Sequence, residues 1–173
     1  MPTGLLFLTQ LILGYVAWLL CFATYGVPRL RAMDRVQVHR AIATLHSFRF
    51  FGLVFLVPGV VGPGLPAGFA PAAAWGDFAT GVLAILALLT VRVRPLFWGF
   101  VVAFNLVGVG DFVLDYWHAV RGGLPEHAGA LGAAYAIPVL YVPLLMITHG
   151  FALSDLARRR SGVASALAGE TTA

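Results

Sequence analysis

The sequence predicts an all-α integral membrane protein, a polytopic bundle of five transmembrane helices. Of its 173 residues, 60% are apolar and only 10% are charged, and the mean hydropathy is +0.90. A soluble domain carries about 25% charged residues, so the composition excludes a water-soluble fold. At about 20 residues per spanning helix, the chain has room for five helices joined by short loops.

Five apolar runs follow one another, and charged residues, prolines or glycines close each of them. The first run ends before Pro28 and a group of arginines, and the second ends at the sequence Pro63-Gly64-Leu65-Pro66. Spans are therefore expected at 4–26, 41–62, 75–91, 96–120 and 133–153. Together they form one transmembrane domain, 1–155, followed by a polar tail, 156–173, that is expected to be disordered.

The arginines predict how the bundle is oriented. All 11 basic residues are arginine, and nine lie in the 1–2 loop, the 3–4 loop and the tail: Arg29, Arg31, Arg35, Arg40, Arg92, Arg94, Arg158, Arg159 and Arg160. The positive-inside rule then places the N-terminus outside and the C-terminus and tail in the cytoplasm. The expected location is a bacterial cytoplasmic (inner) membrane, with the lipid bilayer as partner.

Composition also excludes several functional classes and covalent features. Without lysine, the chain has no amine for a retinal or pyridoxal phosphate Schiff base. Cys21 is the only cysteine, so no intramolecular disulfide forms. The net charge of +4 arises from arginines placed as topology signals and lipid-headgroup contacts, which argues against nucleic-acid binding.

Two polar side chains fall within the second span. His46 and Arg49 are three residues apart and share one helix face. A charge in the membrane interior costs at least about 2.5 kcal/mol on insertion scales, so Arg49 is expected either to snorkel to the surface or to meet a buried carboxylate.

The fourth span carries a polar stripe. Spacings of three, three, four and three place its members on one helix face: Asn105, Gly108, Asp111, Asp115 and His118. Asp111 is the deepest acid, so a contact of Arg49 with Asp111 or Asn105 is predicted. Asp77 is expected at the outer end of the third span, either as a cap on that helix or as a member of the polar site.

Two alternatives invoke a cofactor or a metal. His46 and His149 lie at similar depth on different helices, so they could ligate a b-type haem near Arg49. Asp77, Asp111, Asp115 and His118 could bind a divalent metal, although such a site needs three or four converging ligands. The catalytic residues and the metal ligands stay unassigned.

Several short strings resemble a group of small bacterial multi-pass membrane proteins. They are His46-Ser-Phe-Arg49-Phe-Phe-Gly52, Pro66 to Pro71 leading to Trp75-Gly-Asp77, Asn105 to Asp111, and Pro138 to Pro143 with His149. The resemblance covers about residues 41–153. It implies that these residues belong together as a set, and it implies no particular activity.

Four functions fit these observations. The first is binding or transport of a small solute or proton through Arg49, Asn105, Asp111, Asp115 and His149, as a homodimer if it is a transporter. The second is an accessory membrane subunit held together by the stripe. The third is haem-b electron transfer. The fourth is an enzyme acting on a lipid or isoprenoid through Asp111, Asp115 and His118. The sequence favours a protein that is not an enzyme and leaves the ligand open.

Overall fold

A computed structural model describes residues 1–170, and the side chains of residues 1–158. Within these residues every regular element is a helix. In chain order they are α1 (Thr3–Cys21), the π-helix η1 (Phe22–Gly26), α2 (Val27–Arg31), α3 (Arg35–Ser47), the 3₁₀-helix η2 (Phe48–Leu56), α4 (Phe69–Leu89), α5 (Arg94–Arg121), the 3₁₀-helix η3 (Ala128–Tyr135), the π-helix η4 (Ile137–Tyr141) and α6 (Val142–Glu170).

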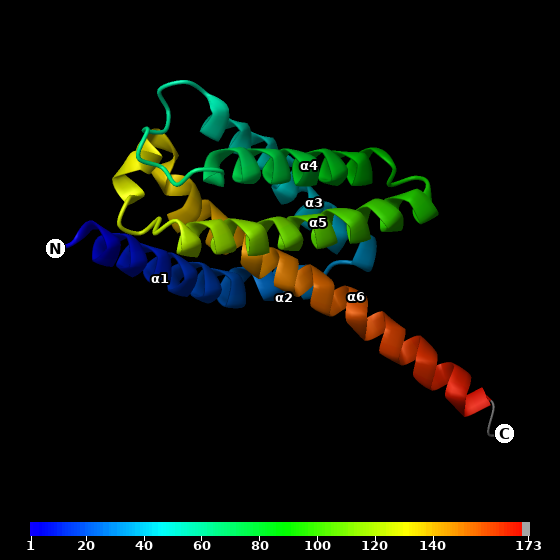
Figure 1. Cartoon of the computed structure of the whole chain (residues 1–173). Coiled ribbons are helices and arrows are strands. Elements are labelled where there is room, and N and C mark those ends of the chain that lie inside the picture. Colours follow the sequence, from blue (N-terminus) through cyan, green and yellow to red (C-terminus); the bar gives the residue numbers. More distant parts are fainter. Residues whose placement is uncertain (171–173) are drawn as a thin grey trace.

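The helices pack lengthwise into one bundle, with the two termini at opposite ends (Figure 1). α4 and α5 lie side by side as the central pair. The segment formed by α3 and η2 runs antiparallel to α4. Ile42, near the middle of α3, shares a core cluster with Ala87 near the end of α4, while Phe55 in η2 packs against Phe69 at the start of α4. α1 and α6 pack against the other side of the bundle (Figure 1).

Four helical stretches in the described part of the chain are long and apolar enough to cross a membrane. They are Thr3–Arg31, Phe69–Leu89, Arg94–Arg121 and Ile137–Arg158. The expected span at 41–62 is not among them, so the count of five is not confirmed. Its first part is the polar helix α3, and its second part, rich in phenylalanine and interrupted by Gly52, winds into the tighter 3₁₀-helix η2.

The third span begins earlier than expected. α4 starts at Phe69, directly after Gly68, whose φ of +84° is a left-handed conformation that suits glycine. The alanine-rich stretch just before the expected span at 75–91 therefore forms the first turns of the helix. Asp77 lies two turns inside α4 and is not a helix cap.

α1 contacts the rest of the bundle where prolines distort the last helix. Pro143 lacks an N–H group and leaves the carbonyl of Val139 without its usual helical donor. Gly14 packs against that carbonyl so closely that a methyl group on Gly14 would collide with it. Trp18 Nε1 donates to the neighbouring carbonyl of Leu140 at 2.8 Å. α1 therefore covers the π-helix η4 just before α6, while most of its apolar side chains stay exposed.

α6 extends beyond the bundle. It runs to Glu170, whereas the sequence predicted the span to end at Leu153 and a disordered tail to begin at 156. Most of the expected tail is therefore helical, and residues 171–173 lie outside the described part. The cytoplasmic placement of this tail stays a prediction.

Two apolar clusters form the core and enclose a polar layer. One cluster includes Phe7, Phe55, Phe69 and Leu131 near the end of the bundle where α4 begins. The other includes Ile42, Ala84, Phe97, Val101 and Phe104 near the opposite end. Between them lies a group of buried polar side chains from five elements: His46, Arg49, Asp77, Asn105, Asp111, Thr148 and His149.

Candidate functional site

The guanidinium of Arg49 is the centre of the buried polar layer, and its side chain has no exposed surface. Its Nε donates to Asp77 Oδ1 at 2.6 Å, and its Nη2 donates to Asp111 Oδ2 at 2.5 Å. Its Nη1 donates to His149 Nε2 at 3.2 Å. One side chain on η2 therefore joins α4, α5 and α6. The snorkelling alternative is wrong, and the predicted contact between Arg49 and Asp111 is confirmed.

Glycines make room for this ion-pair network. A methyl group on Gly76 would collide with the carboxylate of Asp111, so α4 must be bare there for Asp111 to reach Arg49. A methyl group on Gly108 would collide with Arg49 Nη1 and His149 Nε2. The network thus occupies space that larger residues would fill.

The proton on His149 follows from its neighbours. A guanidinium can only donate hydrogen bonds, so Nε2 of His149 must accept and the ring proton lies on Nδ1. Nδ1 then donates to Asn105 Oδ1 at 2.9 Å, and Asn105 Nδ2 donates to the carbonyl of Val101 at 2.8 Å. His149 is therefore a neutral imidazole, and Asn105 reaches Arg49 only through it.

His46 lies beside this network without joining the ion pairs. Thr148 donates its hydroxyl hydrogen to backbone carbonyls one turn earlier on its own helix. It must therefore accept from His46 Nε2, at 3.0 Å. The rings of His46 and His149 are in contact, with centroids 4.0 Å apart. Nδ1 of His46 is buried and has no hydrogen-bond partner among the described residues.

A haem does not fit between these two histidines. A bis-histidine haem needs the two rings on opposite faces of a porphyrin. Here the rings touch each other at an interplanar angle of 42°. Nε2 of His149 faces Arg49 and Nε2 of His46 faces Thr148, so neither points to a shared iron position.

Three contributors were not predicted from the sequence. The centre of the Phe112 ring lies 4.1 Å from the guanidinium carbon of Arg49, a cation–π contact that favours the positive charge. Thr148 accepts the hydrogen bond from His46, and Gly76 leaves the space that the carboxylate of Asp111 occupies. In the sequence, Gly76 and Phe112 stand out only because they are neighbours of Asp77 and Asp111. That adjacency does not show which residue of another helix they contact.

A cavity of about 200 Å³ adjoins the carboxylate side of the network. Most of its lining is apolar and comes from α1, α4, α5 and η4, with the phenyl rings of Phe7, Phe55, Phe69 and Phe112 among its walls. Asp77, Asp115 and Tyr116 add polar groups. Asp115 lies one turn after Asp111 on the same face of α5. Its Oδ1 is buried and has no hydrogen-bond partner among the described residues.

The polar stripe of α5 does not act as one site. Asn105, Gly108 and Asp111 face the network, and Asp115 faces the cavity. His118 lies further out, against Trp117 and close to Gly68. Among the described residues, no three His, Cys, Asp or Glu side chains come together as a metal site. The structure therefore brings Asp77, Asp111 and Asp115 near Arg49 and leaves His118 apart.

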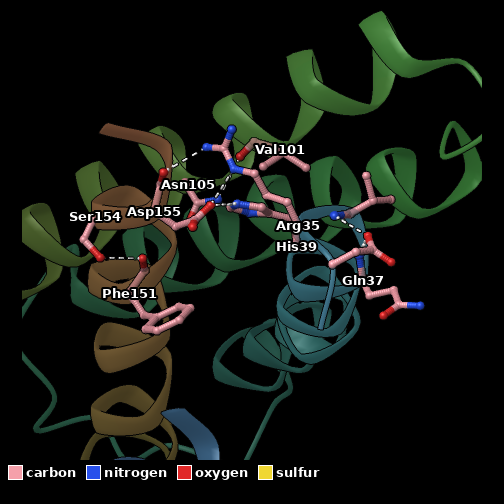
Figure 2. Close-up of polar contacts among 10 residues, drawn as sticks. Arg35, Gln37, His39, Val101, Asn105, Phe151, Ser154 and Asp155 are labelled. Carbon is pink, nitrogen blue, oxygen red and sulfur yellow. Dashed lines mark hydrogen bonds and ion pairs between the residues drawn. The ribbon is translucent and has the colours of Figure 1, made fainter. Parts of the chain in front are cut away.

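A second polar group, drawn in Figure 2, joins Arg35 and His39 of α3 to Asp155 of α6. Asp155 accepts from Arg35 Nε at 2.8 Å and contacts His39 Nε2 at 3.0 Å. Arg35 Nη2 donates to the backbone carbonyl of Asp155 at 2.8 Å. Burial lowers the pKa of His39, and the contact with Asp155 opposes this shift in part. This group links α3 to α6.

Fold and site define a class of protein: a multi-span membrane protein with a buried cluster of arginine, aspartate and histidine. The chain belongs to the family described as domain of unknown function DUF8737, whose model matches residues 6–157. That range holds both polar groups and the cavity. No curated protein and no solved structure matches the chain.

Proposed function

We propose that this protein binds a small, positively charged solute with an apolar body in the cavity beside Asp115, in competition with protons. The observation that carries the proposal is the buried Oδ1 of Asp115, which has no hydrogen-bond partner among the described residues and lies at a mostly apolar cavity wall. A carboxylate in such a place binds a cation or takes up a proton.

The charge balance of the site supports a cationic ligand. Arg49 supplies one positive charge and is already bonded to Asp77 and Asp111. His149 accepts a hydrogen bond from Arg49 and is therefore neutral. Asp115 adds a third carboxylate within one helical turn of Asp111. With all three acids ionised the site is short of two positive charges, which protons or a bound cation would supply.

The cavity lining indicates the rest of the ligand. Four phenylalanine rings and several aliphatic side chains line it, so the ligand body is expected to be apolar or aromatic. Aromatic faces also attract a cationic group. The volume of about 200 Å³ suits a molecule of the size of a small aromatic amine.

The proposed topology has the N-terminus outside and the C-terminus in the cytoplasm, and it keeps the predicted span 41–62, which holds the second half of α3 and all of η2, as a fifth crossing. At 1.5 Å per residue in the α-helix and about 2.0 Å in the 3₁₀-helix, this segment is long enough for a hydrocarbon core of about 30 Å. The cavity then opens toward the outer side. If the protein transports its ligand, the small bundle would act as a homodimer in the bacterial cytoplasmic membrane.

The test is a binding measurement with benzylamine on the purified protein in detergent. Benzylamine is expected to raise the unfolding temperature of the wild type saturably, because its ammonium pairs with Asp115 while its ring enters the cavity. Acidification should weaken the binding as protons compete. Asp115→Asn should weaken it by at least about tenfold.

Two controls make this result specific. Benzyl alcohol has the same ring without the charge and should stabilise much less. Asp34→Asn also converts a carboxylate to an amide, but at the N-cap of α3, where asparagine caps equally well, and it should bind like the wild type. Equal stabilisation by benzyl alcohol, or unchanged benzylamine binding in Asp115→Asn, would refute the proposal.

A structural role as an accessory subunit is the second candidate. It is favoured by the ion-pair network itself, because Arg49, Asp77, Asp111 and His149 join four elements with their hydrogen bonds satisfied. In that case Asp115→Asn leaves every ligand response unchanged, while loss of Arg49 still destabilises the bundle.

A further inference from the structure

A groove with a basic rim opens at the end of the bundle opposite the cavity, between α2 and α6. It has a volume of about 400 Å³, and three arginines line it: Arg31, Arg35 and Arg158. Apolar side chains, among them Leu30, Met33 and Phe151, form its other wall. We propose that this groove binds the phosphodiester headgroup of an anionic phospholipid.

The groove carries an excess of positive charge. Its one acid, Asp155, already bonds to Arg35 and contacts His39. Arg31 and Arg158 form no ion pair with any described side chain, and both are exposed. The groove therefore offers two uncompensated guanidinium groups, which suit a phosphate or a doubly charged lipid.

The side chain of Arg35 is preorganised for such a ligand. Its Nε and Nη2 are both bonded to Asp155, and its guanidinium carbon lies 5.2 Å from the ring centre of Trp98. Figure 2 shows this side chain reaching across to α6. Nη1 has no partner among the described residues and is free to donate. A donor that is already ordered loses little entropy on binding.

The position of the groove selects a lipid over a soluble anion. Arg31 is the last residue of the candidate span Thr3–Arg31, and Arg158 begins the run of three arginines, 158–160, that follows the apolar part of α6. The groove therefore lies at the level where a membrane changes from acyl chains to headgroups. Phe22 packs edge-on against Phe151 at 5.6 Å, which continues the apolar wall toward the membrane interior. Basic pockets of this kind on the cytoplasmic side bind acidic headgroups.

The experiment is native mass spectrometry of the full chain, released from detergent after incubation with cardiolipin, phosphatidylglycerol or phosphatidylcholine. The wild type is expected to retain the two anionic lipids and not phosphatidylcholine. The double variant Arg31→Gln/Arg158→Gln should bind them roughly 30-fold more weakly, since each basic side chain near the surface contributes about 1 kcal/mol.

The matched control is Arg40→Gln/Arg92→Gln, which removes the same charge from two exposed arginines outside the groove. It should bind anionic lipid like the wild type. Equal losses in both double variants would mean diffuse attraction and would overturn the proposal. Retention of phosphatidylcholine at the same level, or displacement of the lipid by millimolar inorganic phosphate, would overturn it as well. Benzylamine binding is unaffected by either outcome, so this test is independent of the cavity.

Discussion

Arg49 shows why the buried layer needs a guanidinium. It makes three hydrogen bonds in three directions, to Asp77, Asp111 and His149, while its flat face lies on the ring of Phe112. A lysine ammonium has three donors but no planar fork and no stacking face. The chain has no lysine, and Arg49 is the one arginine among the described residues of this layer, so the two carboxylates depend on this one side chain for their counter-charge.

Replacing Arg49 by methionine is therefore expected to destabilise the protein by about 3–5 kcal/mol, because two buried carboxylates lose their counter-charge. The triple variant Arg49→Met/Asp77→Asn/Asp111→Asn should recover a large part of this loss, since it leaves no buried charge in the network. Thermal unfolding in detergent, followed by size-exclusion chromatography, measures both effects.

Arg40→Met is the control for this series, since Arg40 is exposed on the neighbouring helix α3, and it should unfold like the wild type. A single variant Arg49→Met as stable as the wild type would show that the ion pairs are not needed for the fold.

His39 gives the protein a stability that depends on pH. Its pKa is lowered below 6.5, chiefly by burial. A histidine with a lowered pKa is stabilising in its neutral form, so its contribution is complete above about pH 6.5 and is lost as the pH falls through the folded-state value. Asp155 and Arg35 are the charged groups that face it.

His39→Gln is accordingly expected to lose less unfolding temperature than the wild type between pH 7.5 and pH 5. The glutamine amide can still donate to Asp155 and does not titrate. His127→Gln, in the loop after α5, replaces an exposed histidine whose ring contacts the backbone carbonyl of Gly123, and it should keep the wild-type slope. Parallel slopes for the wild type and His39→Gln would contradict the prediction.

Among the helices, α5 shows that two glycines on one helix can have different roles. Gly108 faces Arg49 and His149, whereas Gly110, two residues later on the same helix, has open space around it. Gly108→Ala is expected to lower the unfolding temperature and weaken the ion-pair network. Gly110→Ala should be neutral or stabilising by up to about 1 kcal/mol, because alanine is the better helix former.

This pair of variants separates packing from helix propensity, because the chemical change is the same at both positions. Thermal unfolding of the two purified variants decides it. Equal effects at Gly108 and Gly110 would show that α5 does not depend on close approach at Gly108.

The helices also show which parts of the fold could be predicted from the sequence. The stripe from Asn105 to Asp111 was predicted correctly, because helical spacing alone places these residues on one face of α5. The start of α4 was not, because the glycine- and proline-rich stretch before Trp75 looks like a loop unless one knows that Phe69 and Ala73 pack against the core. The 3₁₀-helix η2 was missed for a similar reason. Its winding brings Arg49, Gly52 and Phe55 to the buried side. This winding depends on the packing of η2 against α4.

In the whole molecule, the α3–η2 segment determines which side of the membrane each later loop occupies. If the α3–η2 segment crosses the membrane, the loop around Gly64 is outside and the loop around Arg92 is in the cytoplasm. In a Cys21→Ser background, a membrane-impermeant maleimide should label Gly64→Cys in intact cells. Arg92→Cys should react only after the cells are opened.

Both positions are exposed in the structure, so a difference in labelling reports the membrane side and not burial. Protection of Gly64→Cys in intact cells would mean that the α3–η2 segment returns to the side from which it entered. The bundle would then have four crossings, and its termini would lie on the same side.

Sequence alone predicts the membrane class of the protein, long apolar helices that overlap 4–26, 96–120 and 133–153, and the polar residues that have to be buried together. These follow from local quantities: the cost of exposing apolar or charged groups in a given solvent, and the spacing of residues along a helix. Only the tertiary structure decided that Asp77 bonds to Arg49 and is not a helix cap, that His46 and His149 touch each other, and that Asp115 faces a cavity. Those outcomes depend on how separate helices approach, and that approach is set by small residues and packing across the bundle, which no single segment encodes.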